Sequence, residues 1–277
     1  MSETASIPRF AVVGNPISHS ISPGIHQAFS EQVKIPLQYH AIEIARDDFE
    51  NGIQDLQQQG YSGLNVTVPF KQEAWALCHR RSPRAEDSGA VNTLIFQDDG
   101  EIAGDNTDGV GLTRDLVNNH HALINHRKIL LLGAGGAVRG VLPALLALSP
   151  EELTIANRTM EKAEQLADDF RNHGEVTPCA YEDLGRDKFD LIINGTSAGL
   201  NNEVPPIPVE VLGVNSICYD MMYNLNSDTA FVEWAQNSGA SRALDGLGML
   251  VEQAAESFFI WHGVRVDSKT IIDSLRQ

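Results

Sequence analysis

A glycine-rich turn at residues 133–140 has the residue types and spacing to hold a nucleotide. It reads Gly-Ala-Gly-Gly-Ala-Val-Arg-Gly and follows an apolar run, Lys128–Leu132, that predicts a buried strand. Glycines let a pyrophosphate approach the backbone closely, and the amides that open the following helix favour an anion. The match to G-x-G-x-x-G is imperfect, because the sixth position is Val138. A buried strand, turn and helix without a ligand is the alternative interpretation.

The end of the next predicted strand, Leu153–Ala156, favours NADP over NAD. Units that bind NAD usually place an acid about 20 residues further on, where it accepts from the ribose 2′-OH. Here the strand is followed by Asn157, Arg158 and Thr159. A guanidinium can hold a 2′-phosphate through its planar donors, and the two neighbours can add hydrogen bonds. An exposed arginine that happens to follow a strand is the alternative.

Two serines follow the strand predicted at Phe10–Gly14. Ser20 and Ser22 lie two residues apart, so in an extended segment both hydroxyls could face one anion. Ser22 could also cap a helix whose first residue is Pro23, since serine before proline is a common helix start. Both roles can hold at once.

Further along, polar residues follow other predicted strands. Alternation along the strand places Asn65 and Thr67 on one side, and Lys71 comes shortly after. A lone lysine is usually a solvated surface group. Asp105 could be a helix cap or a turn residue, and Asp108 lies in the first turn of a predicted helix, where an acid often only complements the helix dipole.

Elements that could position these residues fall into two series of alternating strands and helices. This alternation predicts an α/β fold with crossover helices, and the second series has the rhythm of a doubly wound parallel sheet. A helix is predicted at 107–118 and a strand at Ala90–Phe96. Amphipathic helices predicted at 247–261 and 268–276 are expected to pack back on the first domain.

Composition narrows the classes of partner. The chain of 277 residues has a formal net charge of −17 and a pI near 4.8, which disfavours nucleic acid and anionic membranes. The most apolar stretch, 129–148, contains Arg139 and several glycines, which is typical of a buried helix rather than a membrane span. The three cysteines are isolated, no metal-ligand pattern is present, and the first residues lack signal-peptide features. We therefore expect a cytoplasmic protein without a metal.

Taken together, the motifs resemble the shikimate dehydrogenase family, and the resemblance covers essentially the whole chain. Several motifs in one order are more specific than any single one. The matching segments are GNPISHSISPGIH (14–26), NVTVPFK (65–71), GAVNT (89–93), GDNTDG (104–109), GAGGA (133–137), NRT (157–159), NGTSAG (194–199), YDMMY (219–223) and DGLGMLVEQAA (245–255).

The resemblance implies an activity and a set of site residues. Members of the family reversibly reduce 3-dehydroshikimate to shikimate with NADPH, in the route to chorismate and the aromatic amino acids, with the substrate between two domains. Lys71 and Asp108 would form the catalytic pair. The residues that would bind the substrate are Ser20, Ser22, Asn65, Thr67, Asn92, Tyr223 and Gln253. Those that would bind NADP are Gly133, Gly135, Gly136, Ala137, Asn157, Arg158, Thr159, Thr196, Met221 and Gly246.

The same resemblance fixes the expected domain organisation. Residues 1–106 and 243–277 would form the substrate-binding and catalytic domain, and residues 107–242 the Rossmann-like NADP-binding domain. A monomer or a homodimer is expected. One departure from the family pattern follows Tyr223, where Asn224-Leu-Asn replaces the frequent asparagine-proline pair and leaves the loop shape open.

Two alternative functions remain open at this point. One is a quinate/shikimate dehydrogenase that uses NAD as well as NADP, although an acid after the second strand would be expected for it. The other is a noncatalytic dinucleotide-binding regulator on the same fold, for which the loss of Lys71 or Asp108 would be the signature. Both residues are present.

Overall fold

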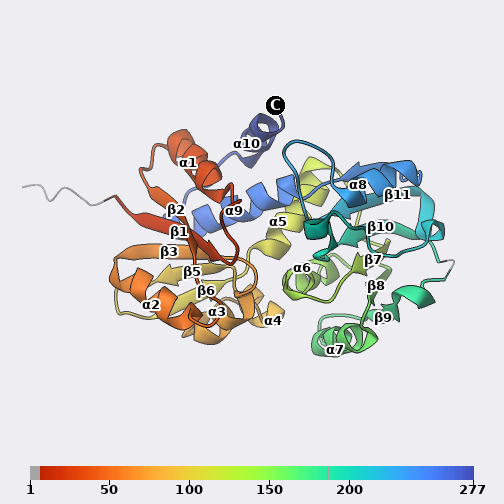
Figure 1. The fold of residues 1–277 in the computed structure, drawn as a ribbon, viewed down its shortest axis with the longest axis horizontal. Helices are drawn as coiled ribbons and strands as arrows, with labels where there is room; N and C mark the ends of the chain where they lie inside the picture. Colours follow the sequence, from red (N-terminus) through yellow and green to blue (C-terminus); the bar gives the residue numbers. More distant parts are fainter. Residues whose placement is uncertain (1–6, 186) are drawn as a thin grey trace, which may run out of the picture. The chain divides into compact units, whose positions relative to one another are not determined.

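A computed structural model describes residues 7–185 and 187–277 (Figure 1). The chain forms two compact units. Unit 1 combines the chain up to Asp108 with Val251–Ser274, and unit 2 consists of Gly109–Leu250 and Leu275–Gln277.

These bounds differ from the expected ones near residues 106 and 243. Strand β12 (Arg242–Leu244) pairs in parallel with its neighbour in the sheet of unit 2, so this segment does not join the first domain. Helix α9 (Leu247–His262) then contains the second boundary, because Leu250 falls in unit 2 and Val251 in unit 1.

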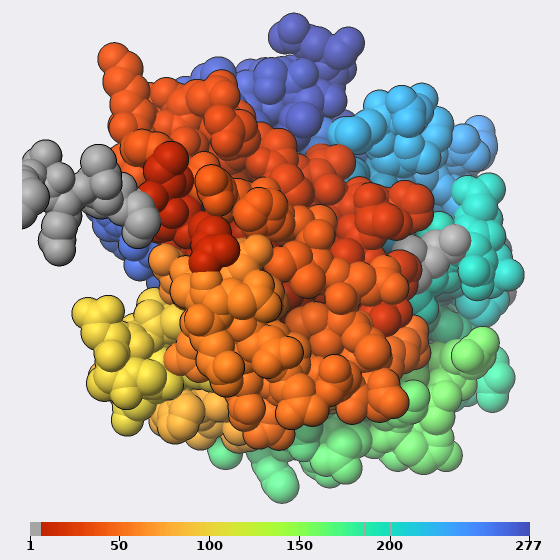
Figure 2. Space-filling view, turned by 60° about the vertical axis from the view of Figure 1, so that its left-hand side comes forward, coloured from red at the N-terminus to blue at the C-terminus, as the bar shows by residue number. Residues whose placement is uncertain are grey.

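Unit 1 is built on a mixed six-stranded sheet with the order β2-β1-β3-β5-β6-β4. Its strands are β1 (Arg9–Gly14), β2 (Gln38–Glu43), β3 (Tyr61–Val66), β4 (Arg80–Arg81), β5 (Thr93–Phe96) and β6 (Ile102–Asp105). β1 pairs in parallel with β2 and β3, whereas β5 runs antiparallel to β3 and β6. In Figure 2 the segments coloured red and orange, which come from the first part of the chain, form one continuous surface.

Helices cover both faces of this sheet. α1 and α9 lie on one face, and α2 and α3 lie on the other (Figure 1). The helices are α1 (Ser22–Val33), α2 (Phe49–Gln58), α3 (Lys71–Leu77), α4 (Pro83–Ser88), the unit 1 part of α9, and α10 (Ser268–Leu275). The chain from Val251 onward therefore returns to unit 1, where α9 packs on one face of the sheet.

Alternation along β3 decides which side chains reach each face. Leu64 and Val66 point into the apolar cluster under α2 and α3. Gly63 and Asn65 point to the opposite face, where α9 lies. The packing requires glycine at position 63, because a Cβ there would lie 2.5 Å from Nε1 of Trp261 on α9. Close packing of α9 on this face thus places Asn65 directly beneath the helix.

Unit 2 contains a fully parallel sheet with the order β12-β11-β10-β7-β8-β9. The strands not yet given are β7 (Lys128–Leu132), β8 (Glu152–Asn157), β9 (Thr177–Ala180), β10 (Phe189–Asn194) and β11 (Leu212–Asp220). The chain moves outward from β7 through β8 to β9, then returns to place β10 on the other side of β7. Nucleotides bind at such a reversal of strand order, beyond the carboxyl ends of the strands.

Both faces of this second sheet are buried, which explains the unbroken apolar run in β7. Ile129 and Leu131 enter one core cluster, and Leu130 and Leu132 enter the other. The covering elements are α5 (Asp108–Arg114), a π-helix (Asp115–Asn119), α6 (Gly136–Leu146), α7 (Met160–Phe170), α8 (Ala230–Asn237) and the 3₁₀ turns Tyr181–Asp183, Ala198–Asn201 and Val209–Val211.

The helix expected at 107–118 is not a single α-helix. The α-helical part ends at Arg114 and continues as the π-helix. Asp115 is 1% exposed at this change, and its carboxylate accepts from the Tyr219 hydroxyl at 2.7 Å and from the Asn119 amide at 2.9 Å. The Asp115 carboxylate thus points into the protein at the place where the α-helix changes to the wider π-helix. Among the described residues, no helix has the length and hydrophobicity that a bilayer crossing requires.

Candidate active site

Lys71 and Asp108 form an ion pair in unit 1. Lys71 opens α3 and Asp108 opens α5, and the Lys71 ammonium donates to the Asp108 carboxylate at 2.5 Å. The two side chains are only 16% and 7% exposed. Lys71 is therefore not a solvated surface lysine, and Asp108 does more than complement a helix dipole.

A short buried loop, residues 90–92, holds the segments of this pair together. The Val91 amide donates to the Lys71 carbonyl at 2.8 Å. The Asn92 amide donates to the Asp105 carbonyl, and the Val66 amide donates to the Asn92 carbonyl. Since these backbone groups are used here, β5 begins at Thr93 and not at residue 90 as expected.

The side-chain amide of Asn92 has a defined orientation. Its Oδ1 accepts from the Thr107 backbone amide at 2.9 Å, and that amide can only donate. Its Nδ2 must therefore be the atom that faces Asp108, and it donates to Oδ1 of Asp108 at 2.9 Å. One carboxylate oxygen is held by Asn92 and the other by Lys71, so the carboxylate cannot rotate without breaking a bond.

Two more predicted residues join this network. Asn65 is 6% exposed, accepts from the Tyr39 hydroxyl at 2.7 Å and donates to Ser257 on α9 at 2.9 Å. Oε1 of Gln253, also on α9, accepts from Asn92 at 3.3 Å and from the Thr107 hydroxyl at 3.4 Å. Unit 1 thus brings together the five predicted residues Asn65, Lys71, Asn92, Asp108 and Gln253.

The serine pair has a different arrangement from the one expected of a cap. α1 begins at Ser22, and its N-cap is Ile21, whose side chain makes no capping hydrogen bond. The alternative role of Ser22 as the helix cap is therefore wrong, because Ser22 is already the first helical residue. Its backbone amide donates to the Ser20 hydroxyl at 3.3 Å, which holds the two serines together. Thr67 follows β3 and its methyl group lies where a side chain at Gly14 would be.

The glycine turn of unit 2 leaves open space at the start of α6. Gly133 has φ +100°, which favours glycine, and Gly135 is the N-cap of α6. A Cβ built on Gly135 or Gly136 would meet nothing within 4 Å, and both residues are exposed. This turn can accept a bulky anion against its backbone, as NADP binding requires.

Val138 breaks the glycine pattern without disturbing the packing. It is fully buried, and a Cβ on Gly195 would lie 2.5 Å from its Cγ2. The third glycine of the fingerprint normally permits a close approach of helix and strand. Here the missing side chain at Gly195, after β10, provides the space that Val138 fills.

Other predicted cofactor residues gather at the carboxyl ends of β10, β11 and β12. Asn194 ends β10; its Oδ1 accepts from the hydroxyl of Thr196 at 2.7 Å, and its carbonyl accepts from the Met221 amide. Gly246 has no room for a side chain because the Met221 carbonyl lies against it. Tyr223 follows in the same segment of unit 2, and burial raises the pKa of its hydroxyl.

Arg158 and its neighbours lie beyond the end of β8. Arg158 is exposed, and within the described residues it forms no ion pair. The Asn157 side chain donates to the Thr159 carbonyl at 2.8 Å and shapes this turn. The guanidinium is thus available to an anion from solvent, as a 2′-phosphate site needs.

Three family models match most of the chain. Residues 12–94 match the shikimate dehydrogenase substrate binding domain. Residues 115–201 match shikimate / quinate 5-dehydrogenase, and residues 246–276 match the shikimate 5′-dehydrogenase C-terminal domain. A shikimate dehydrogenase (NADP(+)) of Alkalilimnicola ehrlichii is 52% identical over 268 residues, which cover 97% of this chain and 98% of that protein. The chain belongs to the shikimate dehydrogenase family.

Solved structures agree with this family assignment. An Ael1 enzyme from Pseudomonas putida has a TM-score of 0.90 and 44% identity, and the match covers 98% of both chains. Shikimate 5-dehydrogenase from Thermus thermophilus, in complex with NADP(H) and shikimate, has a TM-score of 0.85 and 31% identity over 98% of this chain and 99% of that one. The expected family and two-domain α/β fold are confirmed.

Four residues of the unit 1 network were missed at the sequence level. Thr93 and Thr107 stand inside the motifs GAVNT and GDNTDG, and both are fully buried. Ser257 lies four residues after Gln253, so helical spacing could have placed it beside that residue. Tyr39 carries no local signal, since its contact with Asn65 depends on the register of β1 between β2 and β3.

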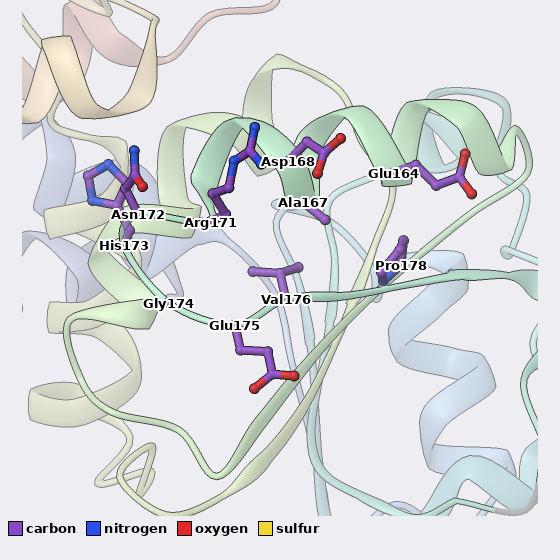
Figure 3. A pocket seen from close by; sticks show the side chains of 10 residues that line it. All are labelled: Glu164, Ala167, Asp168, Arg171, Asn172, His173, Gly174, Glu175, Val176 and Pro178. Atoms are coloured by element: carbon purple, nitrogen blue, oxygen red, sulfur yellow. The ribbon is translucent and has the colours of Figure 1, made fainter.

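A hollow of about 780 Å³ in unit 2 contains none of the predicted site residues. It opens between the end of α7 and β9 (Figure 3). Ala167, Val176 and Pro178 line its apolar part, and charged side chains such as Asp168 surround it. Its charged residues are exposed and supply no buried polar group for a ligand. We assign it no role in this family member.

His26 supports the same network from behind. Its ring is fully buried and stacks on Tyr39 with centroids 4.1 Å apart. Burial, assisted by nearby His262, lowers the pKa of His26 to about 3, and Asn65 offsets part of this effect. Among the residues that the structure describes, none forms a hydrogen bond with either ring nitrogen. His26 is therefore neutral in the folded protein at any pH near neutrality.

This burial predicts a pH-dependent stability. Between the unfolded pKa of 6.5 and the folded pKa of about 3, only the unfolded chain binds a proton at His26. Stability should therefore fall as the pH falls through this window, by at most about 1.4 kcal/mol per pH unit. We expect His26→Phe to remove this part of the slope between pH 6 and pH 5.

Urea unfolding followed by tryptophan fluorescence measures the slope. A Trp234→Phe background leaves Trp75 and Trp261, which both belong to unit 1. The matched control is His19→Phe, at an exposed position. Equal slopes for the His26→Phe variant and its background would show that His26 is not the group that titrates.

Proposed function

We propose that this chain is an NADP-dependent shikimate dehydrogenase that reversibly reduces 3-dehydroshikimate to shikimate. The observation that carries the proposal is the buried Lys71–Asp108 pair, embedded in a network with Asn65, Asn92 and Gln253, in a member of this family. Curated relatives at 50–52% identity carry the name shikimate dehydrogenase (NADP(+)).

In this proposal unit 1 binds the substrate and carries out the proton transfer. The hydroxyls of Ser20 and Ser22, held together at the start of α1, would bind the substrate carboxylate. The residues that would bind the substrate hydroxyls are Asn65, Thr67, Asn92, Asp108, Tyr223 and Gln253.

Lys71 and Asp108 divide the chemistry between them. The reduction needs a hydride at the ketone carbon, which NADPH would supply when bound. The ketone oxygen then gains negative charge, which the Lys71 ammonium stabilises and to which it gives a proton. Asp108, fixed by Asn92, keeps the lysine directed and accepts a hydrogen bond from the adjacent substrate hydroxyl. In the oxidation direction the lysine receives the proton back.

Unit 2 would bind the cofactor. The turn at Gly133, Gly135, Gly136 and Ala137 would hold the pyrophosphate, and Thr196, Met221 and Gly246 would line the nicotinamide side. Arg158, with Asn157 and Thr159, would bind the 2′-phosphate. The absence of a carboxylate from this triplet supports NADP over NAD and argues against the dual-cofactor alternative.

The remaining details follow from the same proposal. The paired Lys71 and Asp108 argue against a noncatalytic regulator, since such a protein has no need of a buried proton donor. We propose that the enzyme works in the cytoplasm, as a monomer or homodimer, on a small-molecule substrate. Three cysteines without a disulfide in the described chain agree with a reducing compartment.

The direct test is product formation by the purified chain. Shikimate and NADP should give 3-dehydroshikimate and NADPH in equal amounts, and the reverse mixture should give shikimate. Mass spectrometry identifies the acids while absorbance follows the nicotinamide. Binding of both ligands without any product would support the regulator instead.

A further inference from the structure

Ser257 occupies the centre of the buried network, although no role has been assigned to it so far. It is fully buried on α9, one turn after Gln253. Its Oγ lies 2.9 Å from Nδ2 of Asn65, 2.8 Å from Oγ1 of Thr93 and 3.3 Å from Oγ1 of Thr107. One hydroxyl therefore contacts three elements of unit 1: the end of β3, the start of β5 and the segment before α5.

The direction of these bonds follows from the single hydroxyl proton. Ser257 donates that proton to the Gln253 carbonyl at 3.1 Å along the helix. Its lone pairs then accept from the side-chain amide of Asn65, whereas the single proton of the Thr93 hydroxyl can go either to Ser257 or to Oδ1 of Asn92, which lies 2.9 Å from it. Nδ2 of Asn65 also lies 3.2 Å from the Thr93 hydroxyl and 3.2 Å from the Asn92 carbonyl. The distance to Ser257 is therefore the shortest of the three.

The orientation of the Asn65 amide depends on this acceptor. Its Oδ1 receives the Tyr39 hydroxyl, so Nδ2 must point toward α9. A flipped amide would bring Oδ1 against the Asn92 carbonyl, which can only accept, and the Ser257 hydroxyl could donate to it only by giving up its bond to the Gln253 carbonyl. Ser257 thus helps hold Asn65 in one orientation and fixes its distance from α9, which also carries Gln253.

We propose that Ser257 is a positioning residue for substrate binding, which sets the geometry of Asn65 relative to Gln253. This inference rests on the proposed shikimate dehydrogenase activity, since it concerns how the hydroxyls of that substrate are recognised. Ser257 makes no hydrogen bond to Lys71 or Asp108 within the described chain. Its effect therefore belongs to substrate affinity and not to proton transfer.

The first measurement is the kinetics of Ser257→Ala. We expect the KM for shikimate to rise about fivefold to tenfold, as the loss of one buried hydrogen bond predicts. The kcat should stay within about twofold and the KM for NADP should not change. Alanine is a good helix former, so α9 should be preserved, and the loss of buried hydrogen bonds should lower the melting temperature only modestly. Ser30→Ala is the matched control, because Ser30 is a buried helical serine of unit 1 whose hydroxyl donates to the Ile35 carbonyl, away from the network around Asn65.

A double-mutant cycle with Asn65→Ala separates positioning from a general structural effect. If Ser257 acts through Asn65, Ser257→Ala should change kcat/KM for shikimate less than about twofold in the Asn65→Ala background. The same fold loss in both backgrounds, or an unchanged KM in the single variant, would overturn the inference.

Failure of the proposed function would be distinct from failure of this inference. A wild-type enzyme that does not oxidise shikimate contradicts the function itself. A wild-type enzyme that oxidises shikimate, with an equally active Ser257→Ala variant, contradicts only the role of Ser257.

Discussion

Replacing Lys71 with alanine should reduce kcat for shikimate oxidation about 10³-fold while the affinity for shikimate changes little. The substitution removes both the proton-transfer group and the positive charge beside the substrate oxygen, and positioned proton transfer contributes about 10²- to 10⁴-fold in enzymes. Asp108 keeps its bond to Asn92, so the binding network should survive. Steady-state kinetics and shikimate titration by fluorescence measure the two quantities.

A second lysine in unit 1 provides the control for this prediction. Lys269 pairs with Asp273 on α10, but it is 68% exposed. Lys269→Ala should leave both kcat and shikimate affinity at wild-type values. A Lys71→Ala enzyme that turns over as fast as the Lys269→Ala enzyme would remove Lys71 from the chemistry.

Replacing Arg158 with glutamine should raise the KM for NADP about 10- to 100-fold, since a hydrogen bond to a charged group contributes about 1.5 to 3 kcal/mol. The KM for NAD should change little, because NAD has no 2′-phosphate for the guanidinium to bind. Initial rates at varied NADP and varied NAD, with shikimate saturating, measure the change in cofactor preference.

Arg171 provides the matched control for Arg158. It is also an exposed arginine of unit 2, but it follows α7 and borders the hollow at β9. Arg171→Gln should keep the wild-type KM for both cofactors. If Arg158→Gln raises the KM for NAD and NADP equally, the arginine does not recognise the 2′-phosphate.

Local sequence patterns were sufficient for the parts of the fold that depend on burial. β7 is an apolar run because both faces of its sheet are covered, and the glycines that follow it mark a turn with φ +100° at Gly133. Alternation in β3 placed Asn65 on the opposite side from Leu64 and Val66. The strand, the turn and the side to which Asn65 points can be predicted because each depends on the local pattern of apolar, polar and glycine residues.

Long-range contacts could not be obtained in this way. From the residues alone Lys71 resembled a surface lysine, because its partner lies 37 residues away in the chain. The family resemblance named both residues, but not Asn92 as the group that fixes the carboxylate. That contact depends on the loop 90–92, which leaves the strand pattern to bond with Lys71 and Asp105.

Two local expectations failed for identifiable physical reasons. A helix cap was one of the two roles considered for Ser22, but α1 starts one residue earlier than that role requires and its N-cap is Ile21. The predicted boundary at residue 243 assigned residues 243 and 244 to the first domain, but they belong to β12 (Arg242–Leu244), which pairs with β11. Short edge strands of three residues carry too little pattern to be assigned, and a serine before proline does not reveal which residue is the first in the helix.

The most direct test of the central claim is a comparison of kcat/KM for four pairs of substrates, namely shikimate or quinate with NADP or NAD, measured at the absorbance of the reduced nicotinamide. We predict that shikimate with NADP has the highest kcat/KM and that quinate or NAD lowers it by at least about tenfold. With NAD, Arg158 would have no 2′-phosphate to bind. With quinate, the hydrogen-bond network of unit 1 would meet a substrate of a different shape. Equal efficiency with NAD, or with quinate, would contradict the assignment of an NADP-dependent shikimate dehydrogenase.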